Sequence, residues 1–252
     1  MRSKKILYPL FLIAFAFSCE SDLTSANYAG GAGQGGSMTR FSIVGTYMYV
    51  VNNSTIQVFD ISQQAFTAIH SESVGFGMET VFASGEYLYL GASDAMYIYS
   101  IADREHPEFI FRYSHIRSCD PVVVQGNRAY VTLRSGNRCN AGTNALEILD
   151  ITNPYSPFLV KNYPMNTPHG LAIEDNLLFI CEGNSGLKLF DVSNEQELKL
   201  LHTISDIDAY DVIVRNGIAT VTGEDGVFQY QFNTSGSELI LLSTIPVSRV
   251  EI

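Results

Sequence analysis

From residue 38 onward, short apolar stretches alternate with polar turns, and the pattern recurs about every 40 residues. One unit reads as an apolar strand, a tight turn, a strand of aromatic and β-branched residues, a polar loop, an alternating strand and a fourth strand. The turn positions are spaced 40, 41, 49 and 41 residues apart, at Gly45, Gly85, Gly126, Asp175 and Asn216. Five such copies without a helical stretch predict an all-β repeat protein.

Each copy holds four predicted strands. The second strands are expected at 47–51, 87–90, 129–132, 178–181 and 218–221, and the third at 56–60, 96–100, 146–150, 187–191 and 227–231. The fourth are expected near 65–70, 109–113, 158–163, 198–203 and 239–245. A four-stranded unit with two apolar faces cannot bury both alone, and radial stacking buries them against neighbours. The pattern therefore predicts a five-bladed β-propeller of four-stranded blades over residues 38–252.

Two points of this architecture stay open. A β-sandwich or an open β-solenoid is the alternative to a propeller. Because each copy has all four strands, ring closure has two routes: packing of the first copy against the last, or an additional strand from the segment before residue 38.

The N-terminus reads as a targeting segment. Arg2, Lys4 and Lys5 form a basic region, residues 6–17 are mostly apolar, and small residues precede Cys19. The apolar stretch of about twelve residues is shorter than the roughly twenty that a membrane-spanning helix needs. Residues 1–18 are therefore interpreted as a signal peptide. A cysteine directly after the cleavage site is typical of a bacterial lipoprotein, with Cys19 as the lipidated residue, and an ordinary secretory signal is the alternative.

Residues 19–37 are polar and then glycine-rich, so this segment is interpreted as a flexible tether. Removal of the signal peptide would lower the formal net charge by three, from −11 to −14. A protein with this negative charge repels phosphate backbones and anionic lipid head groups. Nucleic acid is therefore not an expected partner, and membrane attachment is expected through the lipid alone.

Several segments resemble LVIVD repeats, which occur in bacterial and archaeal cell-surface proteins and are assigned to β-propellers. They are GNRAYV (126–131), NALEILDITNP (144–154) and SGLKLFDVSN (185–194). CDPVVV (119–124), PHGL (168–171) and GEDGVFQY (223–230) resemble a group of predicted lipoproteins with this repeat and no assigned function. Copies one and two depart from the pattern, with Ser100 in place of Asp and Ser62-Gln-Gln in place of the Asn-Pro turn. The resemblance implies a propeller at the outer membrane or cell surface, or facing the periplasm, and brings no catalytic residue.

Candidate binding residues precede the first strand of each copy. Polar side chains lie six positions before each turn, in an otherwise apolar context, and the innermost strands of a propeller would bring them together at the mouth of a central channel. We expect a ligand-binding site here, formed by Thr39, Glu79, Asp120, His169 and Tyr210, with Arg40 and Asp211 one position later. The loops between second and third strands add Arg134, Glu182 and Glu224 to the same face.

Glu79, Asp120 and His169 could together bind a divalent cation, because carboxylates and imidazole suit several metals. The alternative is that these groups are solvated or bonded to loop backbone. No cofactor is predicted.

The cysteines of the repeat region fall into two classes. The third copy is about eight residues longer than the others, between 133 and 143, and Cys139 lies in this insertion on the same face as Cys119. A Cys119–Cys139 disulfide is therefore expected, in the oxidising environment that export implies. Cys181 lies inside a second strand and is expected to be a buried apolar residue.

The chain has no nucleophile elbow, zinc-protease motif, Cys-x-x-Cys or phosphate loop. Asp60, Asp150 and Asp191 recur at one turn per copy, which predicts a turn-capping hydrogen bond rather than a catalytic role. The sequence favours a non-enzymatic binding or scaffold module for a protein, peptide or glycan at the cell envelope. The alternative is a metal-dependent enzyme at the channel mouth.

Overall fold

The structure is a computed structural model, and it describes residues 32–33, 36–63, 65–114, 121–135 and 144–247. Residues 1–18, Cys19, Cys119, Asp120 and Cys139 lie outside these ranges. The regular elements in the described ranges are β-strands, joined by turns and short loops. Within them no helix has the length and apolar character needed to cross a membrane.

The strands form antiparallel sheets in which neighbours in sequence pair with one another. The first sheet has seven strands: β1 (Ala32–Gly33), β2 (Phe41–Val44), β3 (Tyr47–Asp60), β4 (Thr67–Ser84), β5 (Tyr87–Ala92), β6 (Ala95–Ser100) and β7 (Glu108–Ser114). The second has four: β8 (Val122–Gln125), β9 (Arg128–Leu133), β10 (Ala145–Asp150) and β11 (Phe158–Pro164).

The remaining two sheets have the same four-stranded order. The third contains β12 (Leu171–Glu174), β13 (Leu177–Cys181), β14 (Leu187–Asp191) and β15 (Lys199–Ile204). The last blade contains β16 (Ala209–Arg215), β17 (Ile218–Gly223), β18 (Gly226–Phe232) and β19 (Leu239–Pro246). The architecture is that of a β-propeller with four-stranded antiparallel blades, so the sandwich and solenoid alternatives are excluded.

The prediction of five separate blades is wrong, because the strands of the described residues form four sheets. The first two repeats share one sheet, in which β3 and β4 each run through two of the expected strands. Asn53 pairs with Met78 and Thr55 with Ser73, so the ladder continues from one repeat into the next. No proline removes a ladder donor in these stretches, and Gly75 and Gly77 take positive φ angles of 111° and 78°, which let β4 bend instead of ending.

The five predicted turn positions are confirmed. Each has a left-handed backbone, with φ of 61°, 59°, 58°, 53° and 53° at Gly45, Gly85, Gly126, Asp175 and Asn216. This conformation suits Gly and is tolerated by Asn and Asp, which explains why only these residue types mark the register.

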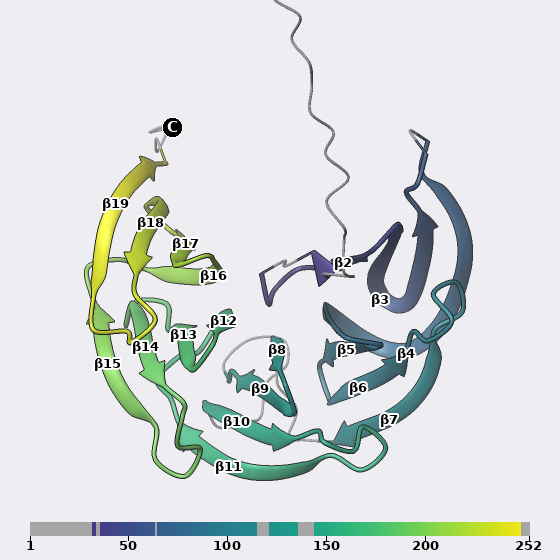
Figure 1. Cartoon of the computed structure of the whole chain (residues 1–252), viewed down its shortest axis with the longest axis horizontal. Coiled ribbons are helices and arrows are strands. Elements are labelled where there is room, and N and C mark those ends of the chain that lie inside the picture. The colour runs from purple at the N-terminus through teal and green to yellow at the C-terminus, as the bar shows by residue number, and fades with distance from the viewer. Residues whose placement is uncertain (1–31, 34–35, 64, 115–120, 136–143, 248–252) are drawn as a thin grey trace, which may run out of the picture.

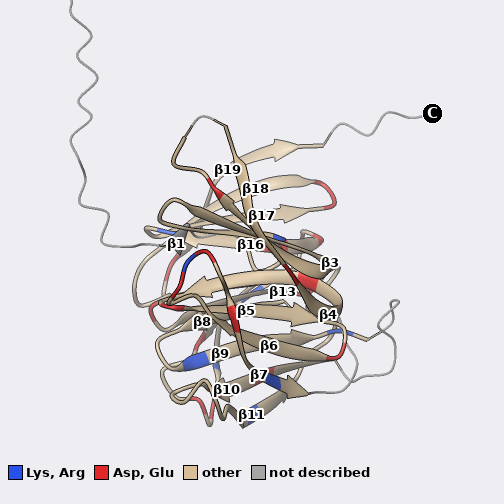
Figure 2. Ribbon diagram, turned by 90° about the vertical axis from the view of Figure 1, so that its right-hand side faces the viewer, with Lys and Arg blue, Asp and Glu red and all other residues tan. Residues whose placement is uncertain are grey.

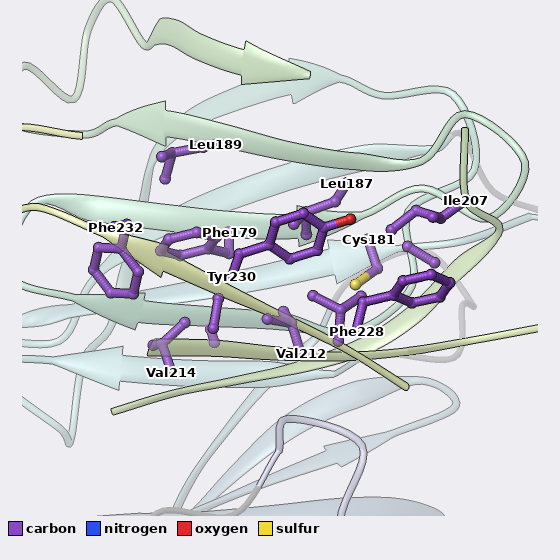
Figure 3. Close-up of a cluster of buried hydrophobic side chains, with 14 of the residues drawn as sticks. Phe179, Cys181, Leu187, Leu189, Ile207, Val212, Val214, Phe228, Tyr230 and Phe232 are labelled. Carbon is purple, nitrogen blue, oxygen red and sulfur yellow. The ribbon is translucent and has the colours of Figure 1, made fainter. Parts of the chain in front are cut away.

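Apolar side chains are buried between consecutive repeats, in four clusters for five repeats. Figure 3 shows the cluster between the third sheet and the last blade, where Phe179 packs against Phe232 with ring centroids 4.8 Å apart. Full burial of such a side chain contributes about 1.5–3 kcal/mol. The contacts between sheets therefore hold each blade at its angle to the next.

The sheets form an open arc and not a closed disc. Figure 1 shows the opening between β19 and β3. Among the described residues, β16 of the last blade packs on β12 and β13, and no extensive strand contact joins that blade to the first sheet. The first route of ring closure is therefore not realised, while the inner strands β2, β8, β12 and β16 still lie around a common axis (Figure 1).

The described residues directly before Met38 take part in the fold. β1 pairs with β2, and Ser37 is buried. The Ser37 hydroxyl accepts a hydrogen bond from the Leu171 backbone N–H at 2.7 Å and donates one to Asp211 at 3.3 Å. The folded part of the chain thus reaches back before Met38.

Figure 2, turned by 90°, shows that the strands are mostly uncharged along their length.

Candidate functional site

A cavity of about 170 Å³ lies where the inner strands begin. We call it the channel-mouth cavity. It is lined by Met38, Arg40, Glu79, Thr80, Pro121, Arg134, Pro168 and His169. These residues come from four of the five repeats, so the arc brings distant segments to one opening, as the sequence predicted. Arg40, Glu79 and His169 belong to the predicted set.

His169 is held in the cavity by its backbone. Its N–H donates to the Cys181 carbonyl at 2.7 Å, and its own carbonyl accepts from the Thr132 hydroxyl at 2.7 Å. An Arg134 Nη1 atom lies 3.0 Å from His169 Nδ1 and 3.1 Å from Nε2, so the guanidinium covers the ring. Burial, and then the positive charge of Arg134, lower the pKa of His169 from 6.5 to about 4. The imidazole is therefore neutral at pH 7.

Glu79 is half-buried within β4 and faces the two arginines. Burial raises the pKa of Glu79, while the charges of Arg40 and Arg134 act in the opposite direction. With His169 neutral, the charged side chains of the lining are two guanidinium groups and one carboxyl group. The described lining thus has an excess of positive charge in a protein whose formal net charge is −11.

Asp211 lies beside the cavity and is turned toward the N-terminal segment. Burial raises its pKa from 3.8 to about 6, opposed by hydrogen bonds from the backbone and from Ser37. Gly170 packs so closely that a Cβ atom there would lie 2.0 Å from an Asp211 carboxylate oxygen. The role of Asp211 is therefore to hold the segment containing Ser37, and it does not line the cavity.

The other predicted site residues that the structure describes do not line this cavity and bond to neighbouring groups instead. The Thr39 hydroxyl donates to the Gly36 carbonyl at 2.8 Å and stabilises a local turn. Tyr210 lies with its ring centroid 5.5 Å from that of His169, and its hydroxyl donates to Glu224 at 2.8 Å. Glu182 is buried and forms an ion pair with Lys188. Asp120 is outside the described residues.

The cysteine predictions have separate outcomes. Cys181 is fully buried and unpaired with another cysteine, which confirms the expectation for this residue, and burial raises the pKa of its thiol. The expected disulfide lies outside the described residues, because both Cys119 and Cys139 do, and so does the lipidation site at Cys19.

Of the three predicted metal ligands, Glu79 and His169 both line the cavity, while Asp120 lies outside the described residues, so the three-ligand site stays a prediction. No group of three His, Cys, Asp or Glu side chains there is arranged to hold a metal ion. Moreover, the Arg134 guanidinium lies against both His169 ring nitrogens, where a cation would meet like charge. The geometry therefore favours binding of an anionic group over binding of a metal.

Arg134 in the cavity lining and Ser37 beside it were not among the residues predicted to form the binding site. Arg134 was expected only on the same face, because it follows β9 and precedes the long insertion of the third repeat. Ser37 was placed in the tether, because nothing in a glycine-rich segment indicates a buried serine. The turn role of the recurrent Asp is confirmed: the carboxylates of Asp150 and Asp191 accept backbone N–H groups two residues on, at 2.8 and 2.9 Å.

Comparison with known proteins supports the fold. The LVIVD repeat family matches residues 35–68 and 116–165. No curated protein matches the chain. A functionally unknown protein from Desulfotomaculum acetoxidans is similar in structure, with a TM-score of 0.67, 11% identity, and coverage of 86% of this chain and 70% of that one.

Two further solved structures have titles that name an activity. The periplasmic gluconolactonase PpgL of Pseudomonas aeruginosa gives a TM-score of 0.63 at 14% identity, covering 81% of this chain and 68% of the other. A candidate 6-phosphogluconolactonase of Bacteroides fragilis gives 0.64 at 12%, covering 82% and 69%. At this identity the likeness shows the fold alone.

Proposed function

Because the chain is an LVIVD-repeat β-propeller, we propose that its channel mouth is a binding site and that the protein is a non-enzymatic binding module of the cell envelope. The ligand is an acidic group of a peptide, protein or glycan. The observation that carries this proposal is the meeting of Arg40 and Arg134 at one cavity with a neutral His169.

The chemistry of the lining selects the ligand. Two guanidinium groups from different repeats present planar N–H donors, which suit a carboxylate. A neutral imidazole can donate one further hydrogen bond. Glu79 limits the excess charge, so a monoanionic group fits better than a highly charged one.

The size of the cavity limits what enters it. Its volume of about 170 Å³ is below the roughly 300–1,000 Å³ of pockets that enclose a drug-sized ligand. The cavity therefore suits the end of a longer molecule, such as the carboxylate of a chain terminus or of a sugar acid, with the rest of the ligand outside.

The test compares matched probes that differ only in charge. Isothermal titration calorimetry would measure binding of short peptides with a free C-terminal carboxylate against their amides, and of oligogalacturonates against their neutral methyl esters. We expect binding of an acidic probe and none of its neutral partner. Arg134→Met should weaken that binding by roughly ten- to a hundredfold, which corresponds to a charge-assisted hydrogen bond of about 1.5–3 kcal/mol.

Arg215→Met is the matched control, because Arg215 is an exposed arginine at the far end of β16. This substitution removes one positive charge, as Arg134→Met does, but outside the cavity. The affinity of the Arg215→Met protein for the acidic probe should therefore equal that of the wild type. Equal affinities for charged and neutral probes, or equal losses in Arg134→Met and Arg215→Met, would contradict the proposal.

Export and lipid attachment are part of the same proposal, supported by the character of residues 1–18 and by Cys19. Labelling of cells with an alkyne fatty acid should mark the wild type and not Cys19→Ala. Surface proteolysis of intact cells then distinguishes an outward from a periplasmic orientation. Unlabelled wild-type protein in the soluble fraction would refute the anchor and leave the binding site untouched.

A metal-dependent enzyme is the weaker hypothesis, because the guanidinium of Arg134 occupies the side of His169 that a cation would need. Metal analysis of the purified protein tests it directly. A stoichiometric metal that is lost in His169→Ala would favour this function over the binding module.

A further inference from the structure

The channel-mouth cavity has an apolar part beside its charged groups. Three apolar residues, Met38, Pro121 and Pro168, are among the residues that line it. Pro168 directly precedes His169 in the chain, and Met38 lies two positions before Arg40. Two of the groups that can bind an acid therefore have an apolar side chain as a near neighbour.

Met38 is the apolar lining residue that stays accessible. It is 40% exposed, whereas Pro121 and Pro168 are buried. The unbranched thioether side chain of methionine adapts its shape to the group that it contacts, so methionine suits a surface that binds apolar groups. Met38 therefore supplies apolar surface that a ligand in the cavity can cover.

The backbone on both sides of Met38 is fixed, which holds its side chain at the cavity. The backbone N–H of Met38 bonds to the Asp211 carboxylate, and the Ser37 hydroxyl donates to the same carboxylate. On the other side, the Thr39 carbonyl accepts the Val81 N–H at 3.0 Å. A ligand meets this side chain without first having to order the chain that carries it, which lowers the entropic cost of binding.

The volume of the cavity decides between the acidic ligands. A protein cavity of about 150 Å³ holds one benzene molecule, and the channel-mouth cavity has about 170 Å³. The carboxylate and aliphatic side chain of one amino acid are of similar size, whereas the substituted ring of a sugar acid is larger. The hydroxyl groups of a sugar would also need hydrogen-bond partners, and the side chains of Met38, Pro121 and Pro168 offer none.

We propose that the ligand is the C-terminal residue of a peptide or protein, with an aliphatic side chain such as that of valine or leucine. This inference rests on the proposed function, because the carboxylate has to bind at Arg40 and Arg134. In a C-terminal residue the carboxylate and the side chain leave the same carbon atom, so both fit one small cavity. The carboxylate faces the guanidinium groups, the side chain covers Met38, and the rest of the peptide extends into solvent.

Isothermal titration calorimetry with matched peptides tests this inference. Acetyl-Ala-Ala-Leu and acetyl-Ala-Ala-Gly have the same carboxylate and differ in the side chain beside it, and the amide of the first removes the charge. We expect the Leu peptide to bind about tenfold more tightly than the Gly peptide, as partial burial of an aliphatic side chain predicts. The amide should not bind.

Substitutions separate the side-chain contact from the carboxylate contact. Met38→Ser should lower the affinity for the Leu peptide by about tenfold, to the level of the Gly peptide. Met38→Leu keeps the apolar surface and should retain the preference. Arg134→Met should weaken binding of both peptides by the same factor, because it acts on the carboxylate alone.

Leu200→Ser is the control, because Leu200 is 50% exposed on the outer strand β15, away from the cavity. This variant removes an exposed apolar side chain, as Met38→Ser does, and it should bind both peptides like the wild type. Circular dichroism melting shows whether each variant is folded.

Equal affinities of the wild type for the Leu and Gly peptides would overturn this inference and leave the proposed function standing. So would binding of oligogalacturonate without binding of either peptide. A preference that survives in Met38→Ser would overturn it as well, because the side chain would then bind elsewhere. Failure of every acidic probe to bind would overturn the inference and the proposed function together.

Discussion

Ser37 and Asp211 are 174 positions apart in the sequence, and a hydrogen bond of 3.3 Å joins the Ser37 hydroxyl to an Asp211 carboxylate oxygen. The same hydroxyl accepts the N–H of Leu171 at 2.7 Å. One buried serine thus links the N-terminal segment to the third sheet and to the last blade. This link joins the segment directly before the first repeat to the far end of the arc.

Replacement of Ser37 by Ala should destabilise the fold. The Leu171 N–H would lose its partner in a buried position, which costs about 1–3 kcal/mol. Urea unfolding followed by circular dichroism measures the difference. Ser71→Ala, at an exposed position of β4, should change the free energy of unfolding by less than about 0.5 kcal/mol. Equal effects of the two substitutions would mean that Ser37 is not a structural link.

The pH dependence of stability should contain two opposing contributions near pH 5. Asp211 has a folded pKa of about 6 against 3.8 when unfolded, so between these values the folded state holds a proton that the unfolded chain has lost. Its contribution to stability is present below about pH 4 and is lost as the pH rises through 6, by at most roughly 3 kcal/mol.

His169 acts in the opposite direction. Its folded pKa of about 4 lies below the unfolded value of 6.5, so the unfolded chain binds the extra proton and stability rises with pH in this window. Asp211→Asn should therefore show a steeper rise in unfolding free energy between about pH 4 and 6.5 than the wild type. His169→Asn should show a fall. Parallel curves for all three proteins would rule out the two assigned pKa shifts.

The recurrent turn aspartates should act through their acceptor oxygen. Asp191 Oδ1 accepts the Ser193 N–H, and this bond lowers the pKa of Asp191. Asp191→Ala should lower the free energy of unfolding by about 1 kcal/mol, whereas Asp191→Asn, which keeps an acceptor, should lose less. Thermal melts of the two variants decide this, and an identical loss would assign the effect to charge instead of the turn.

Much of the fold could be predicted because its determinants are local. Gly45 and the four equivalent residues mark turns that require a left-handed backbone, and strand alternation follows from burial on two faces. The sharing of one sheet by the first two repeats could not be predicted, because it depends on pairing between Asn53 and Met78 across a repeat boundary. The opening of the arc was missed for a related reason, since the angle between blades depends on how side chains pack.

The candidate site shows the same division. The positions of Arg40, Glu79 and His169 within their repeats were enough to predict that they share one cavity, because equivalent positions of the inner strands lie at the same end of the channel. The position of Asp211 in its repeat predicted it there as well, although burial turns this side chain toward Ser37. The contact of Arg134 with His169 depends on the conformation of the Arg134 side chain, and the spacing of residues in the sequence does not predict that conformation.

The most direct test of the assembled channel mouth is the pKa of His169 measured by NMR titration of its imidazole. With Arg134 over a half-buried ring, the wild type should titrate near pH 4, and Arg134→Met should raise that value. A pKa near 6.5 in both proteins would mean that the imidazole is solvated and that the inner strands do not bring these residues together.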